Sequence, residues 1–250
     1  MRKFLFILCH FFAFTTANSQ NIKAGEKLVF AGSYNMSGLM TQLAQVTMST
    51  ENVTTAKNTY LHLSCELSTY SKWDSFFKIR DIYESYVNPT TLKPSLYKRN
   101  IDEGGWTKKE KYVFKGNTVN STSKKRNRPE TQNTFTIGGS TQDVISLLYK
   151  VRTMDLTKFK IGQTQSLMIV FDEKQIPVTL KYMGKETISA GNLGSKECYK
   201  LSIGAKTDAL KGKDKNLIWL TADKKKIPTL LKFSIPVGTG QLTLSSATGI

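Results

Sequence analysis

Apolar and polar side chains alternate along most of the chain after residue 25, and this alternation constrains the fold more than any other feature. Successive side chains of a β-strand point to opposite faces, so period-two alternation marks strands with one buried and one solvated face. The segment Tyr60–Tyr70 shows the pattern most clearly, with its leucines on one face. Turn residues such as Asn88-Pro89 and Gly104-Gly105 separate these segments at short intervals. The chain is therefore predicted to be mainly all-β and antiparallel.

The predicted strands follow one another at spacings of about 10 to 15 residues, which is typical of antiparallel sandwiches and barrels. A further short strand is expected after Gly116-Asn117. The spacing predicts a single domain over residues 20–250, an open or half-open β-barrel or sandwich of roughly 12 strands. The main strands are predicted over Glu26–Tyr34, Met40–Thr50, Tyr60–Tyr70, Ile79–Val87, Leu92–Ile101, Trp106–Lys115, Thr164–Phe171, Ile176–Met183, Glu197–Ile203, Asn216–Thr221, Pro228–Pro236 and Gly240–Ser246.

Two segments break the alternation. Ser123–Asn133 combines a cluster of lysines and arginines with Pro129, and its composition predicts a flexible loop. Apolar residues at positions 144, 147, 148 and 151 match the helical template, which predicts one amphipathic helix over about Thr141–Thr153. Ser140 followed by Asp143 resembles a capping box at its start. The helix is expected to cover one opening or face of the sheet.

The first residues have the layout of a secretory leader. Arg2 and Lys3 precede an apolar run, Phe4–Phe14, which small and polar residues follow. Cleavage before Gln20 is predicted, so that residues 1–19 are a signal peptide; cleavage after Ala17 is the alternative. The apolar run is shorter than the roughly 20 residues of a membrane-spanning helix, and we expect no transmembrane segment after processing. These features predict an exported protein.

The formal net charge of +17 favours anionic partners. Solvated turns and strand ends explain the lysine clusters most simply, and attraction to an anionic envelope surface or lipid head groups is the alternative. Nucleic acid is not expected as a partner, because stacking platforms need exposed aromatic rings and the alternation assigns Trp106 and Tyr112 to the interior. The opposite face of that strand, with Lys109 and Lys111, is expected to be solvated.

Motifs for catalysis or metal binding are missing from the sequence. No phosphate-binding loop or Gly-x-Ser-x-Gly elbow occurs. His62 alternates in phase with a serine and a glutamate, but residues two apart on a strand lie roughly 6.6 Å apart, which favours a polar sheet face over a catalytic triad. Cys65 and Cys198 occupy opposite kinds of strand face and are expected to stay unbridged. We expect no metal, no cofactor and no enzymatic activity.

Carboxylates do not form an obvious acid pair either. Asp81 and Glu84 fall on opposite faces of the predicted strand Ile79–Val87, whereas a glycosidase needs two carboxyl groups that flank one bond. Arg80 and Glu84 share a face, so a structural ion pair between them is expected, with ligand contact as the alternative.

Several blocks, in order along the chain, resemble the bacterial family called domain of unknown function 3108. They are FFKIRDIYESYVNPTTLKP (Phe76–Pro94), IDEGGWTKKEKYVF (Ile101–Phe114), TQDVISLLYKVRTMDL (Thr141–Leu156) and GKDKNLIWLTADKKKIPTLLKFSIPVGTGQLTL (Gly212–Leu244). The resemblance implies an exported envelope protein of a Gram-negative bacterium, in the periplasm or at the outer envelope, with a half-open barrel related in shape to lipoprotein-carrier folds. It implies no activity, and labels of exonuclease or helicase in such families do not agree with the missing phosphate loop.

Two functions from different classes follow. The first is a non-catalytic protein whose curved sheet binds a lipid-like or other amphipathic envelope molecule, with lysines at its anionic end. The second is a structural or assembly factor of the envelope that acts through protein contacts, and a hydrolase is a distant third. For the first, the candidate lining residues are Trp73, Phe76, Phe77, Trp106, Tyr112 and Phe114, with Arg80 as a polar anchor, although each of these is more often plain core.

Overall fold

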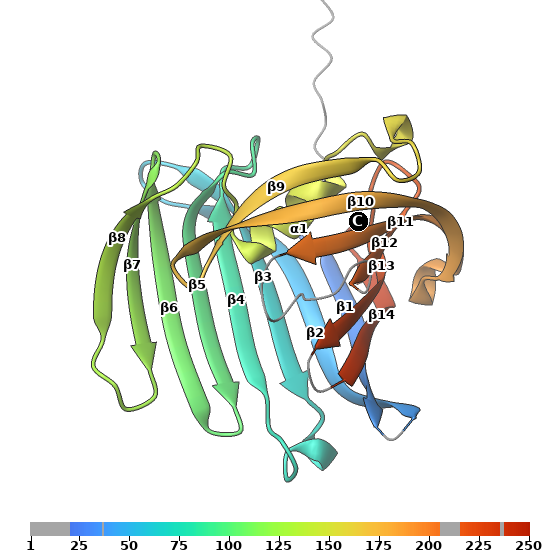
Figure 1. The fold of residues 1–250 in the computed structure, drawn as a ribbon, viewed down its shortest axis with the longest axis horizontal. Coiled ribbons are helices and arrows are strands. Elements are labelled where there is room, and N and C mark those ends of the chain that lie inside the picture. Colours follow the sequence, from blue (N-terminus) through green and yellow to red (C-terminus); the bar gives the residue numbers. More distant parts are fainter. Residues whose placement is uncertain (1–20, 37, 206–215, 236–237) are drawn as a thin grey trace, which may run out of the picture.

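The computed structural model describes residues 21–36, 38–205, 216–235 and 238–250. The predicted leader and its cleavage site lie outside the described residues. Strands make up most of the chain, and all of them belong to one 14-stranded sheet (Figure 1). The strands are β1 (Lys27–Met36), β2 (Leu39–Thr54), β3 (Thr59–Thr69), β4 (Arg80–Val87), β5 (Pro94–Glu103), β6 (Trp106–Lys115), β7 (Thr118–Lys125), β8 (Thr131–Thr136), β9 (Thr164–Phe171), β10 (Lys174–Ser189), β11 (Ser195–Ala205), β12 (Leu217–Thr221), β13 (Pro228–Ile235) and β14 (Gly238–Thr248).

The strands form two antiparallel meanders joined at the chain ends. Each strand from β1 to β8 pairs with its neighbour in sequence, as does each strand from β9 to β14, and β14 then pairs with β1. At that junction Lys27 lies opposite Thr248. The free edges of the sheet are therefore β8 and β9, so the barrel is open in the middle of the chain (Figure 1). This confirms the predicted fold class, an antiparallel half-open barrel with a helix.

The helix α1 (Val144–Arg152) lies against the inner face of the sheet, in contact with β3, β4 and β9. One side of it, with Ile145 and Tyr149, joins a core cluster built from the inner faces of β1 to β7. Its C-terminal end, with Val151, joins a second cluster with Leu180 and Leu201 of β10 and β11. Burial on two sides explains why so short a helix is stable, since helices of this length are marginal on their own.

The helix begins later than predicted. Asp143 is its N-cap: the carboxylate accepts hydrogen bonds from the backbone N–H groups of Ile145 and Ser146, and the Ser146 hydroxyl accepts one from the N–H of Asp143. Ser140 is not the cap, because the residue before Asp143 is extended. The backbone of Gln142 forms a parallel bridge with β9, in which its N–H donates to the carbonyl of Met168.

The predicted loop Ser123–Asn133 is largely a β-hairpin instead. β7 continues to Lys125, β8 begins at Thr131, and Ser123 lies opposite Thr131. The chain turns at Arg126, whose φ is +44°. The cations of this segment are exposed, so they are compatible with strand pairing through the backbone. Composition alone does not reveal that pairing.

The hairpin of β9 and β10 crosses the inner face of the first meander (Figure 1). Its turn is formed by Asp172 and Glu173, with φ values of +47° and +60°. On β9 the side chains of Ile169 and Val170 are buried, whereas those of Leu167, Met168 and Phe171 are half-buried. Cys65 and Cys198 are both free thiols, as predicted.

Candidate functional site

A cleft of about 550 Å³ opens between the β4–β5 turn, the segment before α1 and the edge strand β9. Its volume lies within the range of ligand pockets, about 300–1,000 Å³. The lining combines aliphatic, hydroxyl, amide and ammonium groups, so the cleft is amphipathic. The lining residues are Thr91, Lys93, Gly139, Ser140, Gln142, Lys150, Gln165, Ser166, Leu167 and Met168.

Two lysines give the cleft its positive charge. Lys93 lies in the β4–β5 turn, where the Asn88 side chain accepts hydrogen bonds from the N–H groups of Thr90 and Thr91 and so fixes the turn. Lys150 lies near the C-terminal end of α1, and its Nζ is 3.4 Å from the carbonyl oxygen of Thr91. The helix and the turn are thus held together on one side of the cleft. No carboxylate lines the cleft, and the two ammonium groups therefore favour an anionic ligand.

Gln142 supplies the most specific polar group. Only 6% of this residue is exposed, and its backbone N–H and carbonyl are both used in pairing with β9. Its side-chain oxygen Oε1 has no hydrogen-bond partner among the described residues. A buried acceptor without a donor costs about 1–3 kcal/mol. A hydroxyl or amine donor on a bound molecule would remove that cost.

The remaining wall provides apolar contact. Leu167 and Met168 are half-buried on β9, beside the hydroxyl of Ser166 and the amide of Gln165. A methionine adapts its shape to an irregular ligand more readily than a branched side chain does. The cleft can therefore hold a molecule that has a short apolar portion, a hydrogen-bond donor and a negative charge.

A buried ionic cluster fixes the β9–β10 hairpin near this cleft. Glu110 lies 2.6 Å from Nη2 of Arg99 and 2.7 Å from Nζ of Lys108, and Asp172 at the hairpin turn accepts hydrogen bonds from both cations. Glu173 beside it donates its backbone N–H to the hydroxyl of Tyr112 at 3.0 Å. Burial raises the pKa of Tyr112, so this hydroxyl stays protonated. These contacts hold the hairpin, and with it one wall of the cleft, against the sheet.

The predicted ligand-lining residues divide into two groups, and none of them lines this cleft. Tyr112 is fully buried and Phe114 packs against the core, so both face the interior as expected. The alternation predicts an interior position for Trp106, but this residue is 43% exposed. The reason is its position as the first residue of β6, beyond the part of the strand that the inner elements cover. The exposed position also removes part of the argument against base stacking.

The other candidates lie close to Trp106, in the loop between β3 and β4. Phe76 and Phe77 are 79% and 52% exposed, and Trp73 is half-buried. Gly104 of the β5–β6 turn packs against the ring of Phe77, so closely that a Cβ there would lie 2.8 Å from it. Contact between these residues and a ligand stays a prediction.

The expected ion pair between Arg80 and Glu84 is wrong. Arg80 pairs instead with Asp74, whose carboxylate lies 2.5 Å from its Nη2. The loop between β3 and β4 folds back and brings this carboxylate next to the start of β4. Glu84 lies on the outer face of the sheet and binds Nε2 of His62 at 3.0 Å, while Nδ1 of His62 is 2.8 Å from Glu51. His62 therefore belongs to a polar sheet face, as predicted.

Sequence reasoning missed the residues of the cleft. Gln142 lies where strand alternation changes to helical periodicity, and such a junction could have been examined for a polar site. Lys93 and Lys150 are far apart in sequence, and no local pattern links them. Within the described residues there is no group of three or more His, Cys, Asp or Glu side chains that could hold a metal ion. None of the described helices is long and apolar enough to cross a bilayer.

Comparison with known families decides the classification. The profile of the protein family of unknown function DUF3108 matches residues 33–245. The chain belongs to this family. Among solved structures, the DUF1849 protein from Brucella abortus, which is described as β-barrel-like, superposes with a TM-score of 0.56 at 7% identity; the match covers 89% of this chain and 96% of that one. This likeness shows that the DUF3108 chain shares the β-barrel-like fold.

Two further structures superpose less well. A candidate exported protein with a YmcC-like fold from Bacteroides fragilis has a TM-score of 0.33 at 8% identity, and the match covers 90% of this chain and 96% of that one. A candidate lipoprotein from Parabacteroides distasonis has a TM-score of 0.32 at 10% identity, with the same coverage of both chains. No curated protein matches the sequence.

Proposed function

We propose that this DUF3108 protein is a non-catalytic binding protein of the bacterial cell envelope, which holds an amphipathic, lipid-like molecule by its anionic end. The observation that carries the proposal is the cleft beside β9, whose lining combines apolar side chains, two lysines and Gln142, a residue with a buried side-chain oxygen that has no partner among the described residues. The leader-like residues 1–19 support an exported location, in the periplasm or at the outer envelope.

The composition of the cleft favours binding over catalysis. Its lining offers two ammonium groups, amides and hydroxyls, but no carboxylate, histidine or thiol that could act as a base or nucleophile. The carboxyl groups with raised pKa values, Asp81 and Asp143, are 2% and 0% exposed and do not line the cleft. The composition of the lining therefore supports binding as the role of the cleft.

Native mass spectrometry of the protein purified from its host envelope tests the proposal. We expect an additional mass that corresponds to a lipid, and we expect the stripped protein to bind lysophosphatidylglycerol as a defined probe. The double variant Q142A/K150E should bind the probe at least roughly tenfold more weakly, since it loses a hydrogen-bond acceptor and reverses a charge. Lys111→Glu on the exposed outer face of β6 is the matched charge control and should bind normally. Ligand-free spectra together with equal binding by all three proteins would contradict the proposal.

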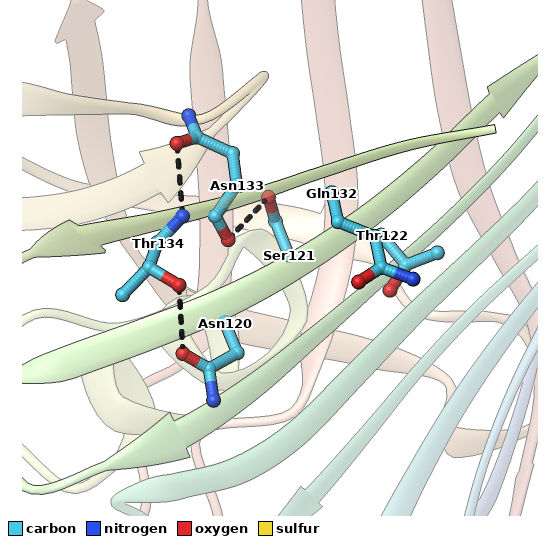
Figure 2. A pocket seen from close by; sticks show the side chains of 6 residues that line it. All are labelled: Asn120, Ser121, Thr122, Gln132, Asn133 and Thr134. Atoms are coloured by element: carbon cyan, nitrogen blue, oxygen red, sulfur yellow. Dashed lines mark hydrogen bonds between the residues drawn. The ribbon is translucent and has the colours of Figure 1, made fainter.

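A specific observation favours the second function, that of an assembly factor. The edge strand β8 is almost entirely exposed, and an exposed edge can accept a strand from another protein. A polar pocket of about 460 Å³ lies along β7 and β8 (Figure 2), lined by Asn120, Ser121, Thr122, Gln132, Asn133 and Thr134.

The edge itself is partly protected. The side chain of Asn133 accepts a hydrogen bond from the backbone N–H of Thr134, and the Thr134 hydroxyl bonds to Asn120 (Figure 2). If the protein binds a partner strand at this edge, the variant Thr134→Pro should abolish the interaction and leave lysophosphatidylglycerol binding intact. If the protein instead acts only by binding a lipid, Thr134→Pro should leave the function of the protein in the envelope unchanged.

A further inference from the structure

One end of the half-barrel gathers exposed apolar side chains. We call this surface the aromatic rim and define it by Leu39, Met40, Trp73, Phe76, Phe77 and Trp106. Of the seven large hydrophobic residues that are exposed in the described part of the chain, five belong to it; Ile82 and Ile161 are the other two. The rim residues lie in or beside the β1–β2, β3–β4 and β5–β6 connections, which an antiparallel meander places at the same end. The gathering is thus a property of the fold and not of one loop.

Hydrogen bonds join these connections to one another. The indole Nε1 of Trp73 donates to the carbonyl of Gln42 at 3.2 Å, which ties the β3–β4 loop to β2. The N–H of Gly104 donates to the carbonyl of Lys78 at 2.8 Å, which ties the β5–β6 turn to the same loop. The β7–β8 turn joins them through a bond of 2.8 Å from the N–H of Arg126 to the carbonyl of Thr107. The rim therefore spans the β1–β2, β3–β4 and β5–β6 connections, and the β7–β8 turn adjoins it.

Exposed cations accompany the aromatic part of the rim. Lys72 and Lys78 flank the aromatic residues of the β3–β4 loop, and the Nζ of Lys72 lies 5.8 Å from the centre of the Trp73 ring. The acidic groups at this end are fewer: Asp74 binds Arg80, Asp102 and Glu103 are half-buried, and Glu66 and Glu130 are exposed. The exposed cations at this end are Lys72, Lys78, Lys109, Lys124, Lys125, Arg126 and Arg128.

We propose that the aromatic rim docks on the surface of an anionic lipid bilayer. Aromatic side chains are favoured at the level of the lipid head groups, and lysine and arginine side chains are attracted to anionic lipids. A set of connections at one end of a rigid sheet can meet a flat surface together, with the phenyl rings of Phe76 and Phe77 entering the head-group layer. The aliphatic side chains of Leu39 and Met40 favour a lipid partner over nucleic acid, because they offer no ring on which a base can stack.

This inference is independent of the proposed cleft. Thr91 and Lys93 of the cleft lie in the β4–β5 turn, and the meander places that turn at the opposite end from the rim. Docking would therefore leave the cleft facing away from the bilayer. The two sites can be tested with separate variants.

Binding to vesicles of equal parts phosphatidylglycerol and phosphatidylcholine tests the proposal by co-sedimentation. The wild-type protein should bind these vesicles. Its binding should be much weaker when the vesicles contain phosphatidylcholine alone, or when the salt concentration is high. Removing two inserted rings in F76S/F77S should weaken binding by roughly tenfold or more. The matched control Ile161→Ser removes an equally exposed apolar side chain, 77% exposed, away from the rim and should bind as the wild type does. Phe77 packs against Gly104, so its replacement could disturb folding. If the double variant does not fold, the single variant Phe76→Ser replaces it in the binding assay.

Tryptophan fluorescence provides a second measurement. Trp73 and Trp106 lie on the rim, whereas Trp219 is 2% exposed in the core. Brominated lipids should quench the wild-type protein, and much of this quenching should be lost in W73F/W106F. The proposal is overturned if anionic vesicles do not bind, if F76S/F77S and I161S lose binding equally, or if a single-stranded oligonucleotide binds through Phe76 while vesicles do not.

Discussion

Two carboxylates at opposite ends of the interior are equally buried but have very different surroundings. Glu26 and Asp81 are each 2% exposed. Glu26, just before β1, binds the two terminal nitrogens of Arg152 with both of its oxygens, each at 2.7 Å. Asp81, on β4 near the aromatic rim, accepts one backbone hydrogen bond from Asp102 at 3.1 Å and lies beside the carboxyl group of Glu103.

The difference teaches that the partners of a buried charge determine its contribution to stability. The guanidinium of Arg152 also reaches the carbonyl of Lys225 and lies over the ring of Tyr149, so the charges of this pair are well compensated. Asp81 has no cation within hydrogen-bond distance among the described residues, and burial together with the charge of Glu103 raises its pKa to about 6. The Glu26 carboxylate attaches the helix to the sheet, whereas the charged Asp81 carboxylate lowers the stability of the fold.

The largest expected effect comes from removing the cation of the compensated pair. Arg152→Ala leaves Glu26 buried without its partner, and we expect the free energy of unfolding to fall by about 3–5 kcal/mol. Urea denaturation followed by circular dichroism measures the change. Lys158→Ala, which removes a cation with 83% side-chain exposure, is the control and should change stability by less than about 1 kcal/mol. Equal effects of the two variants would show that the Glu26–Arg152 pair does not anchor the helix.

Replacing the uncompensated carboxylate of Asp81 is expected to raise the free energy of unfolding, the opposite of the effect of Arg152→Ala. The folded-state pKa of Asp81 lies above its unfolded value of 3.8, so the folded protein binds the proton more tightly and stability falls as the pH rises from about 4 to 6. Above pH 6 the full penalty is present. Asp81→Asn keeps an acceptor for Asp102 and should stabilise the protein by up to about 3 kcal/mol at pH 8, with the gain vanishing below pH 4. Thermal denaturation at several pH values provides the measurement, and a gain independent of pH would contradict this explanation.

Asp143 is an intermediate case, a buried carboxylate held by hydrogen bonds alone. It is 0% exposed, caps α1, and accepts a bond of 2.6 Å from the hydroxyl of Ser85. Asp143→Ala should destabilise the fold by about 2 kcal/mol, since it removes the cap and leaves the Ser85 hydroxyl unpaired. Asp143→Asn keeps an acceptor and should restore part of the loss. Urea denaturation measures the stability of both variants, and equal losses would show that the acceptor kept by asparagine does not replace the carboxylate.

The smallest effect is expected at the hairpin turn, where the carboxylate that pairs with two buried cations is itself half-exposed. Asp172 is paired with Arg99 and Lys108, but 53% of its side chain is exposed. Hydrogen bonds and the charges of these cations lower its pKa despite partial burial, so its contribution is present above about pH 4 and is lost as the pH falls through the lowered value. Asp172→Asn should cost about 1 kcal/mol or less at neutral pH. A difference that persists unchanged in concentrated salt would contradict the ionic explanation.

The sequence allowed the fold class to be predicted because alternation is a local property. The exposed Lys109 and Lys111 and the buried Tyr112 follow directly from the period of two on β6. The pairing of Glu26 with Arg152 could not be predicted, because it joins residues 126 positions apart and no local pattern specifies it. Trp106 was misplaced for a related reason, since alternation gives the face of a residue but not how far along the strand the cover extends.

The pairing of β1 with β14 has a consequence for how the molecule forms. All other strand pairs join neighbours in sequence and can form as soon as both strands are available. The pairing of β1 with β14 can form only after every other strand has been made. A chain that emerges from its amino end would keep one edge of β1 unpaired until β14 has emerged. Loss of β14 would therefore leave β1 with an open edge, a known starting point for aggregation.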